Sequence, residues 1–273
     1  MVIFPNAKIN LGLNILRKRG DGYHELETVF YLIGLKDGLE FIENKQNKIN
    51  FSSSGIPLNI DFEENIVVKA YRLLAADYPL PGLDIHLHKV IPFGAGLGGG
   101  SSDAAFLLKG LNENFGLGLT TEQLKGYAHK LGADCSFFIE NKPAFATGIG
   151  EKLQEIDLSL NGYFLVLVKP PVGVGTKVAY AGIKPGAPKC VLSEAIQMAP
   201  EKWQENLVND FEASVFPLFP EINEIKSKLL SHGAVYAAMS GSGSSVFGLF
   251  KTEPDFMKGI FPEDYFIWKE WIL

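Results

Sequence analysis

One short segment constrains what this chain can fold into more than any other: residues 94–102, which read GAGLGGGSS. Five of the seven residues from Gly94 to Gly100 are glycine, so the backbone can curl and turn several N–H groups inward. A helical pattern from Ala104 to Leu111 follows directly, and a helix N-terminus carries a partial positive charge. Inward N–H groups beside a helix N-terminus are typical of a phosphate-binding loop.

Two serines, Ser101 and Ser102, end this segment. Hydroxyl side chains are preferred at helix N-caps, so we expect both to cap the helix that follows. From there their hydroxyls can also face a phosphate group or a magnesium ion. A flexible tight turn that binds no ligand stays open as the alternative interpretation.

Three familiar nucleotide-binding loops differ from this segment. The Walker loop requires Lys immediately before its Ser or Thr, where this chain has Gly100. The dinucleotide fingerprint is nominally matched by Gly94, Gly96 and Gly99. The acid that it requires about 20 residues later would be Glu122, which falls in a predicted helix. The protein-kinase loop requires later His-Arg-Asp and Asp-Phe-Gly tripeptides, and the sequence has neither.

The charge balance narrows the classes of partner. The chain has 25 Lys and Arg against 31 Asp and Glu, a formal net charge of −6, which argues against a broad nucleic-acid-binding face. No apolar run approaches the roughly 20 residues of a membrane-spanning helix, and the first residues lack the pattern of a signal peptide. We therefore expect a cytoplasmic protein whose partners include no nucleic acid and no membrane. The two cysteines, Cys135 and Cys190, indicate buried thiols rather than zinc ligands or a disulfide, and we assign no metal ligand.

The rest of the sequence alternates between strand and helix patterns. Apolar residues at every second position from Ile9 to Ile15 predict a half-buried strand. Helices are expected after the N-cap residue Asn65, after a capping box at Thr120 that Gly132 ends, and over 221–230. Further strands are expected at 28–33, 39–43, 83–87, around 145, and at 164–168, 235–239, 246–250 and 265–271. The pattern predicts an α+β protein of two domains, 1–165 and 166–273.

A second cluster of glycine and serine, residues 240–245, lies between two apolar strand patterns. On its own it is equally well explained as a simple hairpin turn. Two such loops in one chain suggest a cleft with phosphate on one wall.

Three segments taken together resemble the GHMP kinase superfamily, which includes galactokinase, homoserine kinase and mevalonate kinase. They are Pro5–Leu11, Gly96–Ser102 and Ser240–Ser244, in the family's order along nearly the whole chain. Two more, Lys18–His24 and Leu131–Asp134, are similar to those of the members that act on a cytidine diphosphate derivative in isoprenoid precursor synthesis.

The resemblance implies an ATP-dependent kinase that phosphorylates the 2-hydroxyl of a small-molecule cytidine diphosphate substrate, with ATP as donor and Mg²⁺ present. It implies the two-domain α+β GHMP-kinase-like fold, with the active site in the cleft between the domains. Residues 1–165 would form the nucleotide-binding domain, whose fold is shared with ribosomal domains, and residues 166–273 the C-terminal kinase domain. We expect a monomer or a weak dimer.

The resemblance also implies roles for individual residues. It makes Lys8 and Asp134 the catalytic pair. ATP-binding residues would be Asn65, Pro92, Phe93, Gly94, Ala95, Gly96, Leu97, Gly98, Gly99, Gly100, Ser101 and Ser102. Substrate-binding residues would be Asn10, Tyr23, His24, Thr176 and Tyr180.

Structural explanations remain open for several of these residues. From the residues alone, Asp134 is better explained as a solvated carboxylate at a helix C-terminus, and Lys8 either extends to water or pairs with a carboxylate in a cleft. Asn65 and Lys89 match positions near the adenine, but a helix N-cap and a solvated lysine explain them as well. Asp103 lies in the first turn of the predicted helix, where it suits the helix dipole but repels a triphosphate.

Other functions remain as alternatives. Within the superfamily, homoserine or mevalonate kinase activity is the runner-up. A nucleotide-binding relative that has lost its chemistry is a second class, which the presence of both Lys8 and Asp134 disfavours. An RNA-binding protein is a third class, which the net charge of −6 disfavours.

Overall fold

The computed structural model describes residues 1–58, 60–183, 185–186, 188, 190–255 and 259–273. The described chain divides into two compact units that alternate along the sequence. Unit 1 comprises residues 1–7, 35–92 and 98–142, and unit 2 comprises residues 8–34, 93–97 and 143–273. The predicted domains 1–165 and 166–273 stay a prediction. The compact units divide the chain otherwise, because residues 8–34 and 143–165 group with the C-terminal residues.

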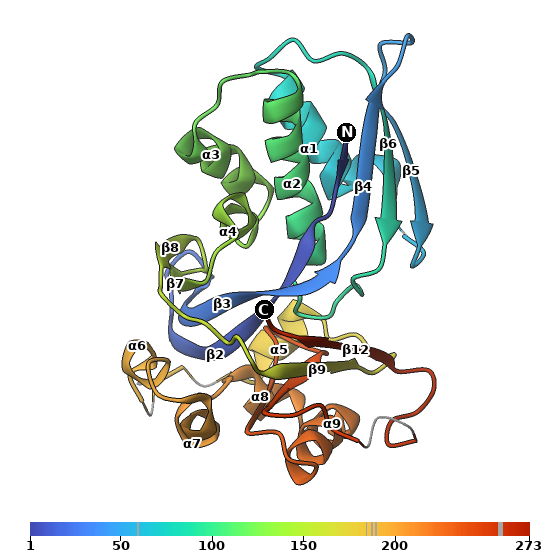
Figure 1. Ribbon diagram of the computed structural model, residues 1–273. Helices are drawn as coiled ribbons and strands as arrows, with labels where there is room; N and C mark the ends of the chain where they lie inside the picture. The colour runs from blue at the N-terminus through green and yellow to red at the C-terminus, as the bar shows by residue number, and fades with distance from the viewer. Residues whose placement is uncertain (59, 184, 187, 189, 256–258) are drawn as a thin grey trace. The chain divides into compact units, whose positions relative to one another are not determined.

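Unit 1 consists of one four-stranded sheet and a group of helices. The sheet has the order β1-β4-β6-β5, with β1 Val2–Ile3, β4 Gly38–Glu43, β6 Leu83–Lys89 and β5 Asn50–Gly55. The helices are η1 Phe62–Glu64, α1 Ile66–Ala75, α2 Gly99–Asn114, α3 Thr121–Leu131 and α4 Cys135–Glu140. Helices α1 and α2 lie beside the sheet (Figure 1).

The contact between α2 and the sheet follows from the period-2 pattern of β4, which buries Leu39 and Phe41 and exposes the residues between them. A Cβ on Gly110 of α2 would lie 3.1 Å from the Phe41 ring and 3.3 Å from Ile3. The small residue therefore lets the helix lie close against β4 and β1.

Unit 2 consists of two four-stranded sheets and the C-terminal helices. One sheet has the order β2-β3-β7-β8, with β2 Asn6–Lys18, β3 His24–Lys36, β7 Ala144–Gly148 and β8 Lys152–Glu155. Residues 6–7 of β2 and 35–36 of β3 belong to unit 1. The other has the order β10-β11-β9-β12, with β10 Tyr236–Met239, β11 Val246–Phe250, β9 Phe164–Lys169 and β12 Phe266–Trp271. The helices are α5 Thr176–Ala181, α6 Leu192–Ala195, η2 Pro200–Lys202, α7 Trp203–Asn206, α8 Phe211–Val215 and α9 Pro220–Ser231.

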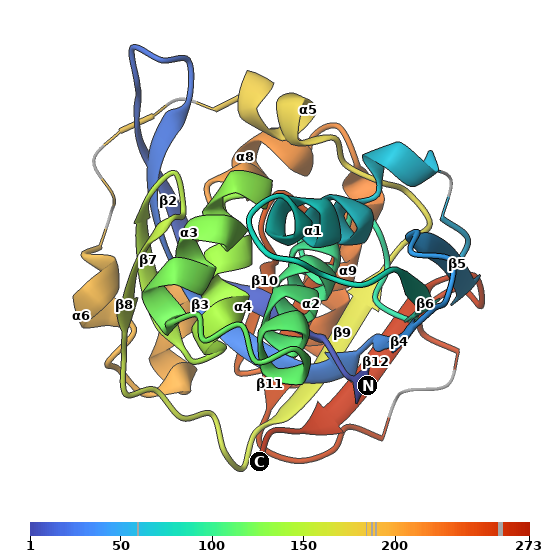
Figure 2. The ribbon, with the colours of Figure 1, turned by 90° about the horizontal axis from the view of Figure 1, so that it is seen from above.

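The core of unit 2 lies between the second sheet and helices α8 and α9. Figure 2 shows β9 beside β12, with which it pairs antiparallel from Phe164↔Trp271 to Lys169↔Phe266. Alternate residues of β9 and the buried residues Ile222, Ile225 and Leu229 of α9 join one apolar cluster. This cluster fixes the hairpin β10–β11, whose connection is the second glycine and serine loop.

Most predicted elements are confirmed, including the capping box at Thr120 and the N-cap at Asn65. Two expectations were wrong. Residues Asn6–Ile15 of β2 are buried on both faces, so the strand is not half-buried, because partners within the protein satisfy its polar residues. Ser101 and Ser102 do not cap α2: the N-cap is Gly98, and both serines lie inside the helix. Among the described residues, no helix has the length and apolar character needed to cross a membrane.

Candidate active site

The first turn of α2 is open to an acceptor from outside the helix. Gly98 occupies the N-cap with φ 69°, in the left-handed region that favours glycine, and has no side chain to cap the helix. The first backbone bond of the helix runs from Ser102 N to Gly98 O, 2.9 Å. The N–H groups of Gly99, Gly100 and Ser101 precede that bond and point out of the helix end, where the helix dipole favours an anion.

Ser102 contributes a buried hydroxyl in the same turn. The residue is fully buried, and its Oγ makes no hydrogen bond in the structure. A buried hydroxyl without a partner costs about 1–3 kcal/mol, so it points to a ligand that supplies the missing bond. An oxygen at this place fits a phosphate group or a hydrated Mg²⁺.

Asp134 lies in a tight turn between α3 and α4, within reach of that same helix end. Gly132 ends α3, and Asp134 is the N-cap residue of α4 but makes no capping hydrogen bond. A Cβ on Gly132 would lie 3.4 Å from Cys135 Sγ and 4.0 Å from Ser101 Oγ. The turn that carries Asp134 therefore lies next to the first turn of α2. Burial raises the pKa of the Cys135 thiol to about 11, so Cys135 is a neutral packing residue here.

A buried ionic cluster lies under the same turn of α2. Lys89 Nζ, at the end of β6, donates to Asp103 Oδ2 at 2.8 Å and to Asp37 Oδ2. Asp37 Oδ1 also accepts from the backbone N–H groups of Val90 (2.6 Å) and Ile91 (2.8 Å). All three charged side chains are at most 2% exposed. Of the two interpretations of Lys89, the solvated lysine is therefore wrong and a place near the adenine stays a prediction; Asp103 points into this cluster.

The cluster carries two carboxyl groups for one ammonium group. Burial, which the Lys89 charge offsets only in part, raises the pKa of Asp103 from 3.8 to about 8. Asp103 Oδ1 is buried and makes no hydrogen bond, which fits a carboxyl group that holds a proton.

Asn65 is buried in the same unit, where its Oδ1 accepts from Val67 N at 2.8 Å. Its N-cap role at α1 is thus confirmed, and its role in adenine binding stays a prediction.

Lys8 and Asn10 lie side by side in unit 2, on the polar side of β2. Lys8 Nζ donates to Asn10 Oδ1 at 2.7 Å and to Gly96 O at 3.1 Å. Asn10 Nδ2 donates to Thr28 Oγ1 at 2.9 Å. Ser240 Oγ donates to Gly96 O at 2.8 Å and accepts from Asn10 N at 3.3 Å. Residues from β2, from the glycine loop (94–102) and from the second loop (240–245) therefore meet at the carbonyl oxygen of Gly96.

The two glycine and serine loops are bonded to each other within unit 2. Ser244 N donates to Gly94 O at 3.2 Å, and Ser245 N donates to Ala95 O at 3.3 Å. Gly96 has φ 73°, and a Cβ there would collide with the Ser240 carbonyl oxygen. Leu97 O accepts from Lys8 N at 3.0 Å. The residues before the loop differ in burial: Pro92 is buried in unit 1, whereas Phe93 of unit 2 is 41% exposed.

The predicted substrate residues of unit 2 are brought together only in part. His24 and Tyr180 stack with ring centroids 4.7 Å apart, and Phe211 meets Tyr180 edge-on at 4.8 Å. Tyr23 is 61% exposed, and Thr176 is exposed at the start of α5, one turn before Tyr180.

Sequence reasoning missed two residues of this site. Thr28 joins the network through Asn10, and its Oγ1 also donates to Gly12 O at 2.5 Å. Asn209 is buried and donates to the backbone on both sides of Ser240. The only local signal for Asn209 is an Asn-Asp pair before an apolar run, which is also an ordinary helix start.

Comparison with known proteins shows the family of the chain. Residues 65–142 match the model of the GHMP kinases N-terminal domain, and residues 192–263 match that of the GHMP kinases C-terminal domain. A 4-diphosphocytidyl-2-C-methyl-D-erythritol kinase of Bacteroides fragilis is 57% identical over 260 residues, which cover 94% of this chain and 95% of that protein.

Two solved structures share the fold. A crystal structure of 4-(cytidine 5'-diphospho)-2C-methyl-D-erythritol kinase has a TM-score of 0.78 and 34% identity, covering 91% of this chain and 90% of its own. The mevalonate kinase of Methanococcus jannaschii has a TM-score of 0.75 over 100% of this chain and 98% of its own, but at 16% identity it shows the fold alone. Since the identities extend over nearly the whole chain, the chain belongs to the GHMP kinase family, as an enzyme that phosphorylates a small molecule.

Proposed function

We propose that the chain transfers the γ-phosphoryl group of ATP to the 2-hydroxyl of 4-diphosphocytidyl-2-C-methyl-D-erythritol. Relatives that bear this activity in their names support the choice of substrate. One structural observation carries the proposal for this chain's own residues: β2, the glycine loop and the loop at Ser240 converge on the carbonyl oxygen of Gly96. Three motifs far apart in sequence thereby form one preorganised polar cluster around Lys8.

The first turn of α2 is proposed to hold the ATP phosphates. Backbone N–H groups of residues 99–101 and the helix dipole favour the negative charge, and no side chain caps this end. The buried Ser102 hydroxyl is proposed to bond a phosphate oxygen or an Mg²⁺ ligand. Mg²⁺ bound with the nucleotide would neutralise phosphate charge, and Ser101 and Ser102 are the residues proposed to face it.

Asp134 is proposed to accept the proton of the attacking hydroxyl, and Lys8 is proposed to act with it as the catalytic pair. The turn of Asp134 lies beside the first turn of α2, which supports a place near the transferred phosphoryl group. The bonds of Lys8 to Asn10 and Gly96 support a fixed position of the ammonium group. The predicted position of the site, in the cleft between the domains, stays a prediction.

The stacked rings of His24 and Tyr180 are proposed to bind the cytosine. Stacking provides affinity for any base at roughly 1–3 kcal/mol, whereas selectivity requires hydrogen bonds to the base edge. His24 is the polar residue proposed to supply them, by its ring or its backbone. Replacing Tyr180 with Ala should raise KM for the cytidine substrate and leave KM for ATP unchanged. Wild-type values of both constants would remove Tyr180 from the site.

The experiment for the whole proposal is ADP release with purified chain, ATP and Mg²⁺, offering one acceptor at a time. The cytidine substrate should give a kcat/KM far above those of homoserine and mevalonate. Turnover of either of those instead would reassign the chain within the family. ATP binding without turnover of any acceptor would indicate a relative that has lost its chemistry.

A further inference from the structure

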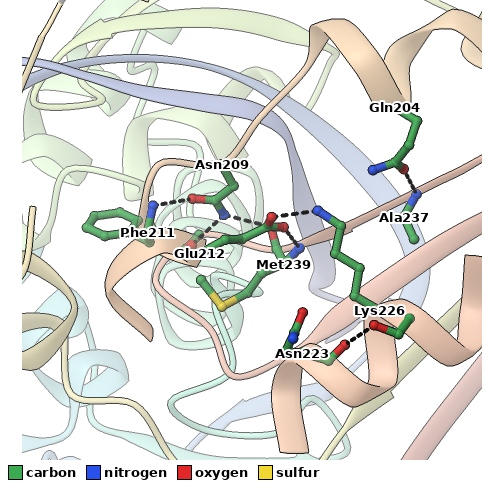
Figure 3. Close-up of polar contacts among 10 residues, drawn as sticks. Gln204, Asn209, Phe211, Glu212, Asn223, Lys226, Ala237 and Met239 are labelled. Carbon is green, nitrogen blue, oxygen red and sulfur yellow. Dashed lines mark hydrogen bonds and ion pairs between the residues drawn. The ribbon is translucent and has the colours of Figure 1, made fainter. Parts of the chain in front are cut away.

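A buried asparagine under the second loop has no role in the function described so far. Asn209 is 3% exposed and uses its whole amide group. Its Nδ2 donates to Met239 O at 2.7 Å and to Gly241 O at 2.8 Å, and its Oδ1 accepts from Phe211 N at 3.0 Å (Figure 3). The side chain therefore holds the backbone immediately before and immediately after Ser240.

The same segment of chain is fixed to β2, the strand that carries Lys8 and Asn10. The backbone around Asn209 pairs with Leu13, since Leu13 N donates to Val208 O (2.8 Å) and Asp210 N donates to Leu13 O (2.9 Å). Asp210 Oδ2 accepts from Ile15 N at 2.6 Å. Asn209 thus links two parts of one network: strand β2 on one side and the turn at Ser240 on the other.

A neighbouring ion pair reinforces the start of that turn. Glu212 Oε1 accepts from Met239 N at 2.9 Å, while its Oε2 receives Lys226 Nζ of α9 at 2.5 Å (Figure 3). Both side chains are less than one-fifth exposed. Met239 is therefore held at its N–H by Glu212 and at its carbonyl by Asn209, which leaves little freedom for the residue that follows.

We propose that Asn209 is a positioning residue for phosphoryl transfer. By fixing Met239 and Gly241 it sets the place of Ser240, whose hydroxyl bonds Gly96 O and the backbone of Asn10. Gly96 O in turn accepts from Lys8 Nζ, so a shift of the turn at Ser240 moves the surroundings of the ammonium group. This inference rests on the proposed catalytic role of Lys8, and displacements of about 1 Å in such a site can cost about 100-fold in rate.

The test is the Asn209→Asp variant, with Asn209→Ala beside it in case the buried charge prevents folding. Asp keeps the size and the acceptor for Phe211 N, but it places an oxygen against two carbonyl oxygens. The matched control is Gln204→Ala. Gln204 Oε1 accepts from Ala237 N at 2.9 Å, so it holds the same strand β10 two residues before Met239, away from the turn.

We expect the Asn209 variants to lose about 10- to 100-fold in kcat for the cytidine substrate, with KM for ATP and substrate nearly unchanged. Gln204→Ala should lose thermal stability and keep its kcat. Wild-type kcat in a folded Asn209 variant would overturn the proposal. So would an equal loss of kcat in Gln204→Ala at an equal melting temperature, because that result indicates general destabilisation.

Hydrogen exchange separates this inference from the choice of substrate. The amides of Gly243 and Ser245 bond to Ser240 O and Ala95 O, so they report the turn without any ligand. Both should exchange faster in the Asn209 variants and at the wild-type rate in Gln204→Ala. Unchanged exchange in the Asn209 variants overturns the positioning role, even if the wild type proves inactive on the cytidine substrate. If the wild type is inactive on the cytidine substrate, faster exchange in the Asn209 variants still supports the positioning role, and only the proposed function fails.

Discussion

Two buried lysines, one in each unit, are held in different ways. Lys89 of unit 1 donates to two carboxyl groups, which come from Asp37, between β3 and β4, and from Asp103 of α2. Within unit 2, Lys8 donates to an amide oxygen and to a backbone carbonyl oxygen. Buried charges therefore help to place Lys89, whereas neutral acceptors on β2 and in the glycine loop help to place Lys8. We infer that the first cluster supports the fold and the second supports the chemistry.

The largest effect should come from removing the charge of the first cluster. In Lys89→Met, two buried carboxyl groups lose their common cation, which typically costs about 3–5 kcal/mol in the free energy of unfolding. Urea unfolding measures this loss directly. A change below about 1 kcal/mol would mean that the cluster adds little to the fold, and the contrast between the lysines would disappear.

In Lys8→Met we expect a large loss of kcat and a smaller loss in the free energy of unfolding. Loss of one preorganised charged group in an active site typically lowers kcat by about 10²- to 10³-fold. The acceptors at Asn10 and Gly96 carry no charge, so the loss of these two bonds should lower its free energy of unfolding by less than Lys89→Met does. Steady-state ADP release and urea unfolding on both variants give the comparison. A Lys8→Met chain that keeps most of its turnover would place Lys8 among the structural residues.

A pair of glycines, one beside each lysine, sharpens the contrast. Ala at Gly96 enters the left-handed region, which costs about 1–3 kcal/mol, and its Cβ collides with backbone at Ser240. Ala at Gly99 has no positive φ to adopt, and it meets side-chain atoms rather than backbone, 2.8 Å from Ile91 and 3.0 Å from Lys89 Nζ, so its cost is smaller. Melting temperatures should therefore fall clearly for Gly96→Ala and by much less for Gly99→Ala. Equal losses would show that the two loop halves tolerate a methyl group alike.

The smallest effect concerns the proton of Asp103. Its pKa is raised from 3.8 to about 8 in the fold, so between these values the folded chain keeps a proton that the unfolded chain releases. The stabilising contribution of this group is therefore fully present below about pH 4, and it falls as pH rises towards 8. Asp103→Asn has no such proton, so its stability relative to wild type should rise by about 1 kcal/mol between pH 5 and pH 6. Urea unfolding of both chains at both pH values checks this. The same stability difference at pH 5 and at pH 6 would contradict the raised pKa of Asp103.

Local rules predicted the elements well, because their signals lie within a few residues. The capping box of α3 and the alternation in β6 are examples. The glycine loop at residues 94–102 was recognised from its glycines, yet the N-cap of the helix that follows was misplaced. Ser101 and Ser102 are good capping residues by propensity, but Gly98 can adopt a positive φ and starts the helix three residues earlier.

Long-range pairing was beyond local rules. The partners of Lys89 are 52 and 14 residues away in the chain, and Ser240 lies 230 residues from Asn10. Polar residues such as Asp37 and Thr28 look like ordinary surface residues in a sequence, since nothing local tells that tertiary packing buries them. The predicted domains 1–165 and 166–273 stay a prediction, and the compact units divide the chain otherwise, because the sheet β2-β3-β7-β8 groups with the C-terminal elements.

The chain passes between the two units five times, at residues 7/8, 34/35, 92/93, 97/98 and 142/143. A single cut of the chain therefore cannot separate the two units. A fragment that ends near residue 165 would contain strands of a unit that is incomplete. Recombination with a junction between residues 143 and 165 would keep the three segments of unit 1 together but would divide unit 2. Substrate preference in such a scaffold is accordingly easier to change by point substitutions within loops than by exchanging whole segments.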